Sequence, residues 1–305
     1  MEYAPVPLKK VMPSMNRMEP LILDHTAIAL YKDCPRKYFF QIVLGFREKD
    51  TPVYFTFGSA YHLFREVLER TKDFKDALSA ATDYWDRVQG DDPHPEMKFS
   101  FMTRLRLMQS CTVAFRHWER EKELGKIEVL AVEQPFNVEL IPNSGEFTSG
   151  RFDQIIRFNG RVWGRDFKTT SKDTKFYDRG LTPNDQFTRY TFAESLLKGE
   201  RVRGQFIEVL YNAKETKSKS GGPEISTFLA ERTDWELDDW LNDEMFVRAT
   251  IKASRENDRW PRNEKGCTFC HFHSVCKIGS ENGQLAKLRS EYVQREWDNT
   301  KTGEV

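Results

Sequence analysis

A single predicted β-hairpin, residues 150–170, constrains the fold of this chain more than any other feature of its sequence. The segment reads GRFDQIIRFNGRVWGRDFKTT. Asn-Gly at positions 159–160 is a strong signal for a two-residue turn between antiparallel strands, and the flanking residues are β-branched and aromatic. A two-residue turn fixes the register of the two strands, so that Asp153 lies opposite Asp166. The sequence therefore predicts two carboxylates that face each other across one hairpin.

The charged side of this hairpin has the composition of a metal site. Carboxylates that face each other across two strands lie roughly 5 Å apart at Cβ and repel. Lys168 is two residues beyond Asp166, so it points to the same face and brings a positive charge to the pair. The opposite face is apolar and is expected to contain Phe152, Ile156, Phe158, Trp163 and Phe167. Converging carboxylates suit a hard divalent cation such as Mg²⁺, whereas the simpler alternative is a solvated hairpin.

Composition describes a soluble globular protein. Of the 305 residues, 39% are hydrophobic, 31% charged and 13% aromatic, and no apolar run is long enough to cross a bilayer. The N-terminal residues contain no apolar segment typical of a secretory signal, so a cytoplasmic location is expected. The 47 basic and 47 acidic residues balance, so any binding of nucleic acid must come from a local surface.

Helical and strand patterns surround the hairpin. Two helical regions, near 74–88 and 97–124, precede a strand that begins at Ile127 and in which Glu133 could face the site, although most strand glutamates are solvated. After the hairpin, Thr182 to Asp185 resembles a capping box with Pro183 as the first helical residue. In that helix Gln186 and Tyr190 are four residues apart and share a face.

A cysteine-rich segment near the C-terminus predicts a metal centre. Three thiols occur there with two and then five intervening residues: Cys267, Cys270 and Cys276. Five cysteines in a chain without an export signal favour metal ligation or buried thiols over disulfides. The fourth ligand could be Cys34, while His271 or His273 would complete a tetrahedral zinc site instead. The spacing does not decide between these ligands.

These motifs occur in an order that resembles one branch of a nuclease family. Cys34 lies in YKDCPRKYFF, and it is followed by GSAYH, the hairpin with Asp and Asp-x-Lys, QFTRY and the terminal CxxCxxxxxC. Over roughly residues 24–277 this series resembles the iron–sulfur RecB-like exonucleases of the PD-(D/E)xK superfamily. That branch includes the nuclease domain of AddB and the CRISPR-associated adaptation exonucleases. One departure is that Arg151-Phe152 precedes Asp153, where a proline often stands in the superfamily.

The resemblance implies a fold and a domain organisation. It implies an α/β restriction-endonuclease-like core over residues 21–256, with a central mixed sheet flanked by helices and a helical insertion at about 72–125. Residues 1–20 are expected to form an irregular arm. Residues 257–305 are expected to form an iron–sulfur region and tail that close onto Cys34.

The resemblance also implies roles for individual residues. The expected metal ligands are His62, Asp153, Asp166 and the main-chain carbonyl of Phe167. Lys168 would orient or activate the attacking water, either as a fixed cation or with a depressed pKa. Gln186 and Tyr190 would position the DNA strand. A [4Fe–4S] cluster would be held by Cys34, Cys267, Cys270 and Cys276, with Zn²⁺ as the alternative metal.

The activity so implied is that of an exonuclease that uses Mg²⁺ or Mn²⁺ to hydrolyse DNA, in recombination, repair or end processing. Its expected substrates are linear ends or single strands, and no membrane is involved. The sequence contains no GxxxxGK[ST] phosphate loop, so any helicase or recombination protein would be a separate partner. The alternatives are a zinc-stabilised endonuclease and a non-catalytic DNA-binding scaffold. The scaffold is disfavoured because the set of catalytic residues is complete.

Overall fold

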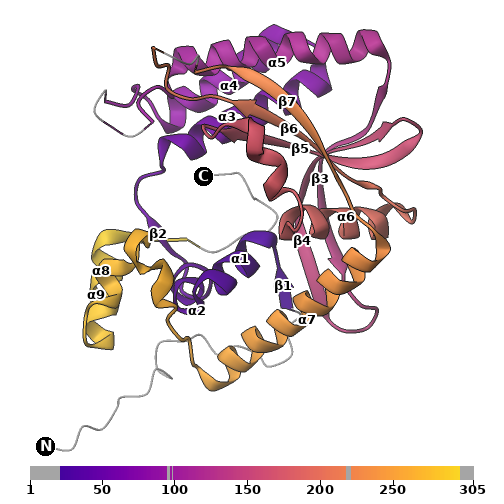
Figure 1. Ribbon diagram of the computed structural model, residues 1–305. Coiled ribbons are helices and arrows are strands. Elements are labelled where there is room, and N and C mark those ends of the chain that lie inside the picture. Colours follow the sequence, from indigo (N-terminus) through magenta and orange to yellow (C-terminus); the bar gives the residue numbers. More distant parts are fainter. Residues whose placement is uncertain (1–20, 95–96, 98, 218–220, 296–305) are drawn as a thin grey trace, which may run out of the picture. The chain divides into compact units, whose positions relative to one another are not determined.

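A computed structural model of the chain describes residues 21–94, 97, 99–217 and 221–295 (Figure 1). The arm expected over residues 1–20 lies outside the described residues, as does the end of the expected tail. The chain divides into two compact units. We call the first the cysteine unit; within the described residues it comprises 21–48, 139–149 and 241–295. We call the second the sheet unit, which comprises Lys49–Val138 and Gly150–Trp240.

The sheet unit is built on a mixed β-sheet. Its strands are β3 (Ile127–Glu139), β4 (Glu146–Phe158), β5 (Arg161–Thr170), β6 (Gly204–Tyr211) and β7 (Glu224–Glu231). Strand β4 pairs with both β3 and β5, and the order then continues through β6 to β7 at the edge. The β5–β6 pair is parallel, whereas the β4–β5 and β6–β7 pairs are antiparallel. The expected mixed sheet is therefore confirmed.

The hairpin has the predicted register. Phe158 pairs with Arg161, and the pairing continues without a slip to Gln154 and Arg165. The two turn residues, at positions 159 and 160, have φ angles of 48° and 74°. Two successive left-handed residues are what a tight hairpin turn of this length requires, and Asn-Gly tolerates them best. The turn sequence thus sets which residues of β4 and β5 are neighbours.

Helices cover both faces of this sheet (Figure 1). On one face lie α3 (Val53–Thr71), α4 (Phe74–Val88) and α5 (Arg104–Leu124), which share a hydrophobic core with Phe167 of β5 and Leu210 of β6. On the other face lies α6 (Asp185–Lys198), and the short helix η3 (Thr174–Gly180) precedes it in the chain. Phe187 and Ala193 of α6 are buried against residues of β5 and β6 that point to the opposite face from Phe167 and Leu210. The period of two along β5 and β6 therefore separates two cores.

Two predictions about residues of the sheet unit are wrong. Phe152 does not share a core with Ile156, because it packs with Ile155 and Val162 on the α6 side. Phe152 and Ile155 are an odd number of residues apart, so the alternation of β4 is broken between them. Helix α6 begins at Asp185 and not at Pro183, because the side chain of Asn184 caps it by accepting a hydrogen bond from the amide of Phe187.

The cysteine unit combines segments from both ends of the described chain. Asp24 caps α1 by accepting a hydrogen bond from the amide of Ala27 at 2.7 Å. Aromatic residues dominate the core, in which Trp260 stacks on both Tyr38 and Phe39. The elements of this unit are β1 (Leu21–Leu23), α1 (His25–Asp33), α2 (Pro35–Tyr38), η2 (Phe39–Val43), β2 (Phe46–Glu48), the larger part of α7 (Asp234–Asn257), η4 (Glu264–Phe269), α8 (His273–Cys276), α9 (Glu281–Glu291) and β8 (Tyr292–Gln294).

Two short pairings close the cysteine unit. Strand β2 pairs with β8, so that Arg47 lies opposite Val293, and β1 pairs in parallel with the first residues of β4. Segments near the two ends of the described chain are therefore joined by backbone hydrogen bonds. Among the described residues, no helix is both long enough and apolar enough to cross a membrane.

Candidate active site

The centre of the site is a contact between α3 and β4. Nδ1 of His62 lies 3.4 Å from Oδ2 of Asp153, and the same carboxylate oxygen accepts a hydrogen bond from the amide of Phe167 at 2.7 Å. Helix α3 supplies the histidine because its apolar side packs on the sheet and leaves His62 half-buried beside the end of the hairpin. The structure therefore brings together His62 and Asp153, which are 91 residues apart in the sequence.

Glu133 of β3 joins this pair. One ligand atom from each of His62, Asp153 and Glu133 lies within 4.8 Å of the other two. The side chain of Glu133 is 11% exposed, and Nη1 of Arg151 lies 3.6 Å from its carboxylate. Its φ angle is 48°, which is a left-handed conformation in the middle of a strand. Residues other than glycine adopt it at a cost of about 1–3 kcal/mol, and such strain is concentrated at functional sites.

Burial and mutual charge shift the pKa values of this group. Burial raises the pKa of Glu133, and the charge of Asp153 raises it further, to about 8. For Asp153, burial alone would raise the pKa, but His62 and Lys168 outweigh burial and lower it. Burial would likewise lower the pKa of His62, but the charge of Asp153 outweighs it and raises that pKa. A carboxylic acid, a carboxylate and a histidine of raised basicity therefore lie within reach of one ion.

Asp166 has a different set of partners. Its Oδ1 accepts hydrogen bonds from Nζ of Lys168 at 3.0 Å and from Nε2 of Gln186 at 3.3 Å. Asp166 does not belong to the group within 4.8 Å that contains His62, so the two facing aspartates reach toward different neighbours. Burial and the charge of Asp153 raise the pKa of Asp166, although Lys168 partly opposes this.

Lys168 is a fixed cation in this arrangement. Burial lowers its pKa, but the charges of Asp166 and then Asp153 outweigh burial, and the net effect is to raise the pKa of Lys168. The alternative of a depressed pKa is therefore disfavoured. An ammonium group that stays protonated can stabilise negative charge but cannot remove a proton from water.

Tyr190 lies in an aromatic cluster beside these charges. Its ring meets the rings of Phe152 and Phe136 edge-on, at centroid distances of 5.5 and 5.8 Å. Phe136 also stacks on Phe152, with centroids 4.1 Å apart. Gly150 makes room for this stack, because a Cβ atom at that position would lie 2.9 Å from the ring of Phe136. The glycine three residues before Asp153 thus has a packing reason.

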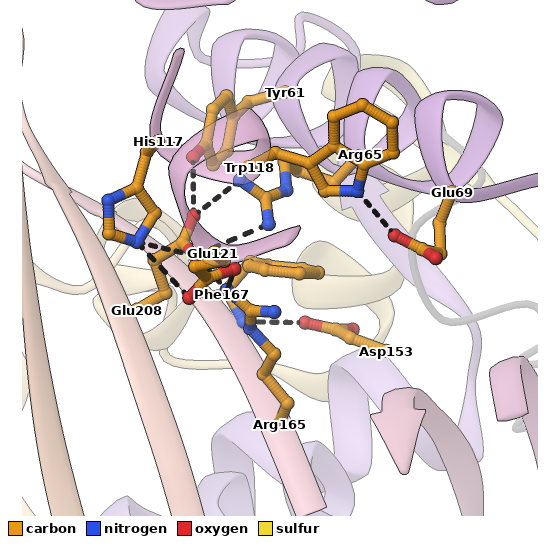
Figure 2. Close-up of polar contacts among 10 residues, drawn as sticks. All are labelled: Tyr61, Arg65, Glu69, His117, Trp118, Glu121, Asp153, Arg165, Phe167 and Glu208. Atoms are coloured by element: carbon orange, nitrogen blue, oxygen red, sulfur yellow. Dashed lines mark hydrogen bonds and ion pairs between the residues drawn. The ribbon is translucent and has the colours of Figure 1, made fainter. Parts of the chain in front are cut away.

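A buried network of ion pairs lies on the α3 side of β5 (Figure 2). The ring of Phe167 is flanked by the guanidinium groups of Arg65 and Arg165, whose carbon atoms lie 4.3 and 5.2 Å from its centroid. Both arginines pair with Glu208 of β6, and Arg165 also pairs with Glu121 at 2.8 Å. This network fixes the strand whose amide holds Asp153.

A second acidic group belongs to the same network. His117, Glu121 and Glu208 offer ligand atoms within 4.8 Å of one another. Arg65 and Arg165 already balance the two carboxylates, and Tyr61 donates a hydrogen bond to Glu208. A cation would have to displace these donors, so we assign the group a structural role.

The four predicted cysteine ligands line one small cavity in the cysteine unit: Cys34, Cys267, Cys270 and Cys276. The amide of Asn263 lies 3.4 Å from the sulfur of Cys34, which ties helix α1 to the segment before η4. His273 also lines this cavity, but His271 does not. The fifth cysteine, Cys111, is fully buried in the core of the sheet unit.

The four cysteine sulfur atoms do not form a group as compact as that of His62, Glu133 and Asp153. All four cysteines are described, and no three of these sulfur atoms, with or without a histidine nitrogen, lie within 4.8 Å of one another. Four thiolates around one zinc ion, each bonded at about 2.3 Å in a tetrahedron, would lie about 4 Å apart. The spacing is therefore wider than a single-ion site requires.

The sequence predicts most of the residues that the structure brings together here, but not all of them. The sequence allows Glu133 to face the site but does not assign it a role. Its left-handed backbone conformation cannot be recognised from the strand pattern. The ion pairs of Arg65, Arg165 and Glu208 were not foreseen. The only available signal was charged residues at positions where the strand and helix periods predict burial.

Comparison with known proteins identifies the fold. The family model of the PD-(D/E)XK nuclease superfamily matches residues 23–277. A crystal structure described as that of a putative exonuclease from Eubacterium rectale is similar over 92% of this chain and 96% of its own, with a TM-score of 0.50 and 12% sequence identity. That likeness concerns the fold alone. No match was found among curated proteins. Since the family model covers most of the chain, including the hairpin, α3 and α6, the chain belongs to the PD-(D/E)XK nuclease superfamily.

Proposed function

We propose that this protein is a metal-dependent DNA exonuclease. The observation that carries the proposal is the convergence of His62, Glu133 and Asp153 within 4.8 Å, next to the Asp166–Lys168 ion pair. Oxygen ligands with one imidazole suit Mg²⁺ or Mn²⁺. When bound, such an ion polarises the phosphate and lowers the pKa of a coordinated water.

The residues of the chain have separable tasks in this proposal. His62, Glu133 and Asp153 would hold the ion, and Asp166 would be a further ligand. The main-chain carbonyl of Phe167 stays an expected ligand. The ammonium group of Lys168 stabilises the negative charge that develops on the phosphate, since the neighbouring carboxylates keep it protonated.

Gln186 and Tyr190 are proposed to position the DNA strand. Both lie on α6, and Gln186 contacts Asp166 through its amide group. An amide nitrogen can donate to a phosphate oxygen as it donates to this carboxylate. The charges of Asp166 and Lys168 act on the Tyr190 hydroxyl group. We therefore expect this hydroxyl group to contact the backbone of a strand that reaches Asp166.

The cysteine cavity is proposed to hold a [4Fe–4S] cluster. The convergence of the four cysteines on one cavity supports this assignment, because each thiolate of a cluster binds a different iron atom. Zn²⁺ stays the alternative metal. The cluster would join Cys34 to a segment more than 230 residues away, which is a structural role.

The nuclease assignment is tested with purified protein, handled without oxygen, on end-labelled linear DNA and on a covalently closed circle of the same sequence. We expect degradation of the linear DNA in Mg²⁺ or Mn²⁺, none in EDTA, and a circle that stays intact. Cleavage of the circle would favour the alternative of an endonuclease, and binding without cleavage would favour a scaffold. Iron and zinc analysis of the same sample separates the two metal assignments.

A further inference from the structure

A second pocket lies in the cysteine unit, next to the cysteine cavity. Its volume is about 420 Å³, which is within the range of sites that bind small molecules or one unit of a polymer. Its walls come from α2 and η2, from residues 258–262, and from the segment between Cys276 and α9. Every residue that lines it belongs to the cysteine unit.

The pocket carries an excess of positive charge. Two acidic residues line it, Asp258 and Glu281, whereas the basic residues that line it are Arg36, Arg259, Arg262 and Lys277. The chain as a whole has no net charge, so this excess is local. A concave site lined by one sign of charge concentrates ligands of the opposite sign.

Most of these cations lack a protein partner. Within the described part of the chain, the side chains of Arg259, Arg262 and Lys277 form no hydrogen bond and no ion pair. Nε of Arg36 donates to the carbonyl of Trp260 at 2.9 Å, which fixes the side chain without neutralising it. The positive charge is therefore available to an anion.

The floor of the pocket is apolar and rigid. The rings of Phe39 and Trp260 are stacked, with centroids 5.3 Å apart and an angle of 22° between their planes. Both rings are at least nine-tenths buried, and Leu288 of α9 is fully buried beside them. An apolar floor below a basic rim suits a ligand that has both a ring and a phosphate, more than a bare inorganic ion.

Charge compensation of the cysteines is the competing explanation. Arg262 and Cys276 line both the pocket and the cysteine cavity, so Arg262 could balance the charge of bound thiolates. Arg259 and Lys277 line the pocket but not the cysteine cavity. These two residues have no thiolate to balance, and they separate the two explanations.

We propose that this pocket binds the phosphate of a nucleotide at the end of a DNA strand. The proposal rests on the proposed nuclease function, which supplies DNA as the ligand. A pocket of about 420 Å³ accommodates about one nucleotide, whereas a continuous strand would extend beyond its walls. Free mononucleotides share the same chemistry, and the experiment below distinguishes the two sources.

The test is a binding experiment on the full chain with its metal centre intact. The Asp166→Ala background prevents cleavage, so binding is measured whether or not the protein proves to be a nuclease. The probes are one fluorescent oligonucleotide with a phosphate at its 5′ end, the same oligonucleotide with a 5′ hydroxyl group, and free dTMP as a competitor. The variants are Arg259→Ala and Lys277→Ala, and the matched control is Arg289→Ala, another exposed arginine of this unit that does not line the pocket.

We expect Arg259→Ala and Lys277→Ala each to weaken binding of the phosphorylated probe about tenfold and to reduce its salt dependence by roughly one counterion. Arg289→Ala should bind like the parent, and all variants should keep their iron content. Loss confined to the phosphorylated oligonucleotide supports a DNA end, whereas loss of dTMP competition alone supports a free nucleotide. Parental affinity and salt dependence of both variants for every probe would overturn the proposal. Cleavage of DNA by the wild type is measured separately, so either idea can fail alone.

Discussion

The carboxylate of Asp153 accepts a hydrogen bond from the main-chain amide of Phe167, with 2.7 Å between Oδ2 and N. This contact joins β4 to β5 beyond the last regular pair of the hairpin, Gln154 with Arg165. Through this contact the backbone of β5, the strand that carries Asp166, holds the carboxylate of Asp153 in place. The geometry of the proposed metal site therefore depends on β5, and the buried arginine network on the α3 side holds this strand in place.

We predict that Glu133 lowers the stability of the metal-free protein and raises its affinity for the metal ion. Glu133→Gly removes both the strained left-handed side chain and a buried carboxylate, so it should stabilise the metal-free protein by about 1 kcal/mol. Glu133→Gln keeps the strain and removes only the charge. Both variants should weaken Mn²⁺ binding at least about tenfold, or about 1.4 kcal/mol. Urea unfolding and calorimetry with Mn²⁺ measure the two effects.

The control for Glu133 is Glu128→Gln, at an exposed position of the same strand. It should change neither quantity. Wild-type Mn²⁺ affinity in Glu133→Gln would show that this carboxylate is not a ligand.

The same residue predicts a pH dependence of stability in the absence of metal. The folded-state pKa of Glu133 is raised from 4.5 to about 8. Between these values the folded chain holds a proton that the unfolded chain has lost, so stability must fall as the pH rises through this window. The fall attributable to Glu133 should be on the order of 5 kcal/mol. Urea midpoints of wild type and Glu133→Gln, measured from pH 5 to 9, should converge at low pH and separate at high pH; parallel curves would disprove the shift.

Tyr190 is predicted to act on DNA and not on the metal. Tyr190→Phe keeps the edge-on contacts with Phe136 and Phe152 and removes only the hydroxyl group. It should lower DNA cleavage about tenfold, or about 1.4 kcal/mol, with unchanged Mn²⁺ affinity. Tyr190→Ala should in addition cost about 3 kcal/mol of stability, because it leaves a cavity beside the two rings. An equal loss of Mn²⁺ affinity in Tyr190→Phe would contradict the separation of roles.

Cys34 is predicted to anchor a clamp between the two ends of the cysteine unit. Cys34 and Cys267 are 233 positions apart, and a cross-link of that reach is worth roughly 5–6 kcal/mol in the chain-entropy model. Cys34→Ser should therefore lose the visible absorption of the cluster, melt at a lower temperature and be cut faster by proteases. Cys111→Ala, at a thiol buried in the sheet unit, should keep the absorption. A colourless zinc protein would rule out iron, and an unchanged melting temperature in Cys34→Ser would rule out the clamp.

The parts of the structure that the sequence predicted are those governed by local chemistry. The Asn159-Gly160 turn set the register, and the period of two then placed Lys168 beside Asp166. Cys267, Cys270 and Cys276 lie in one short segment and line one cavity, to which the fold of the cysteine unit adds the distant Cys34.

The parts that the sequence did not predict depend on contacts between distant segments. The strict alternation of β4 fails after Phe152, because that ring packs with Phe136 and Tyr190 on the α6 side. The left-handed residue Glu133 and the buried pairs of Glu208 each have a local cost, which only the assembled unit can offset. The hydrophobic period indicates which residues are buried. It does not indicate which residues are strained, or where a charged residue occupies a position at which an apolar one is expected.

The most direct test of the account is single-turnover hydrolysis of end-labelled linear DNA in Mn²⁺ by wild type, Asp166→Ala and Lys168→Ala, each with its melting temperature and iron content. The account predicts metal-dependent release of labelled nucleotides by the wild type. In both variants it predicts a loss of at least about a thousandfold, which corresponds to about 4 kcal/mol of transition-state stabilisation, with iron content retained. Hydrolysis by Lys168→Ala at the wild-type rate, or no hydrolysis by well-folded wild-type protein in either metal, would contradict it.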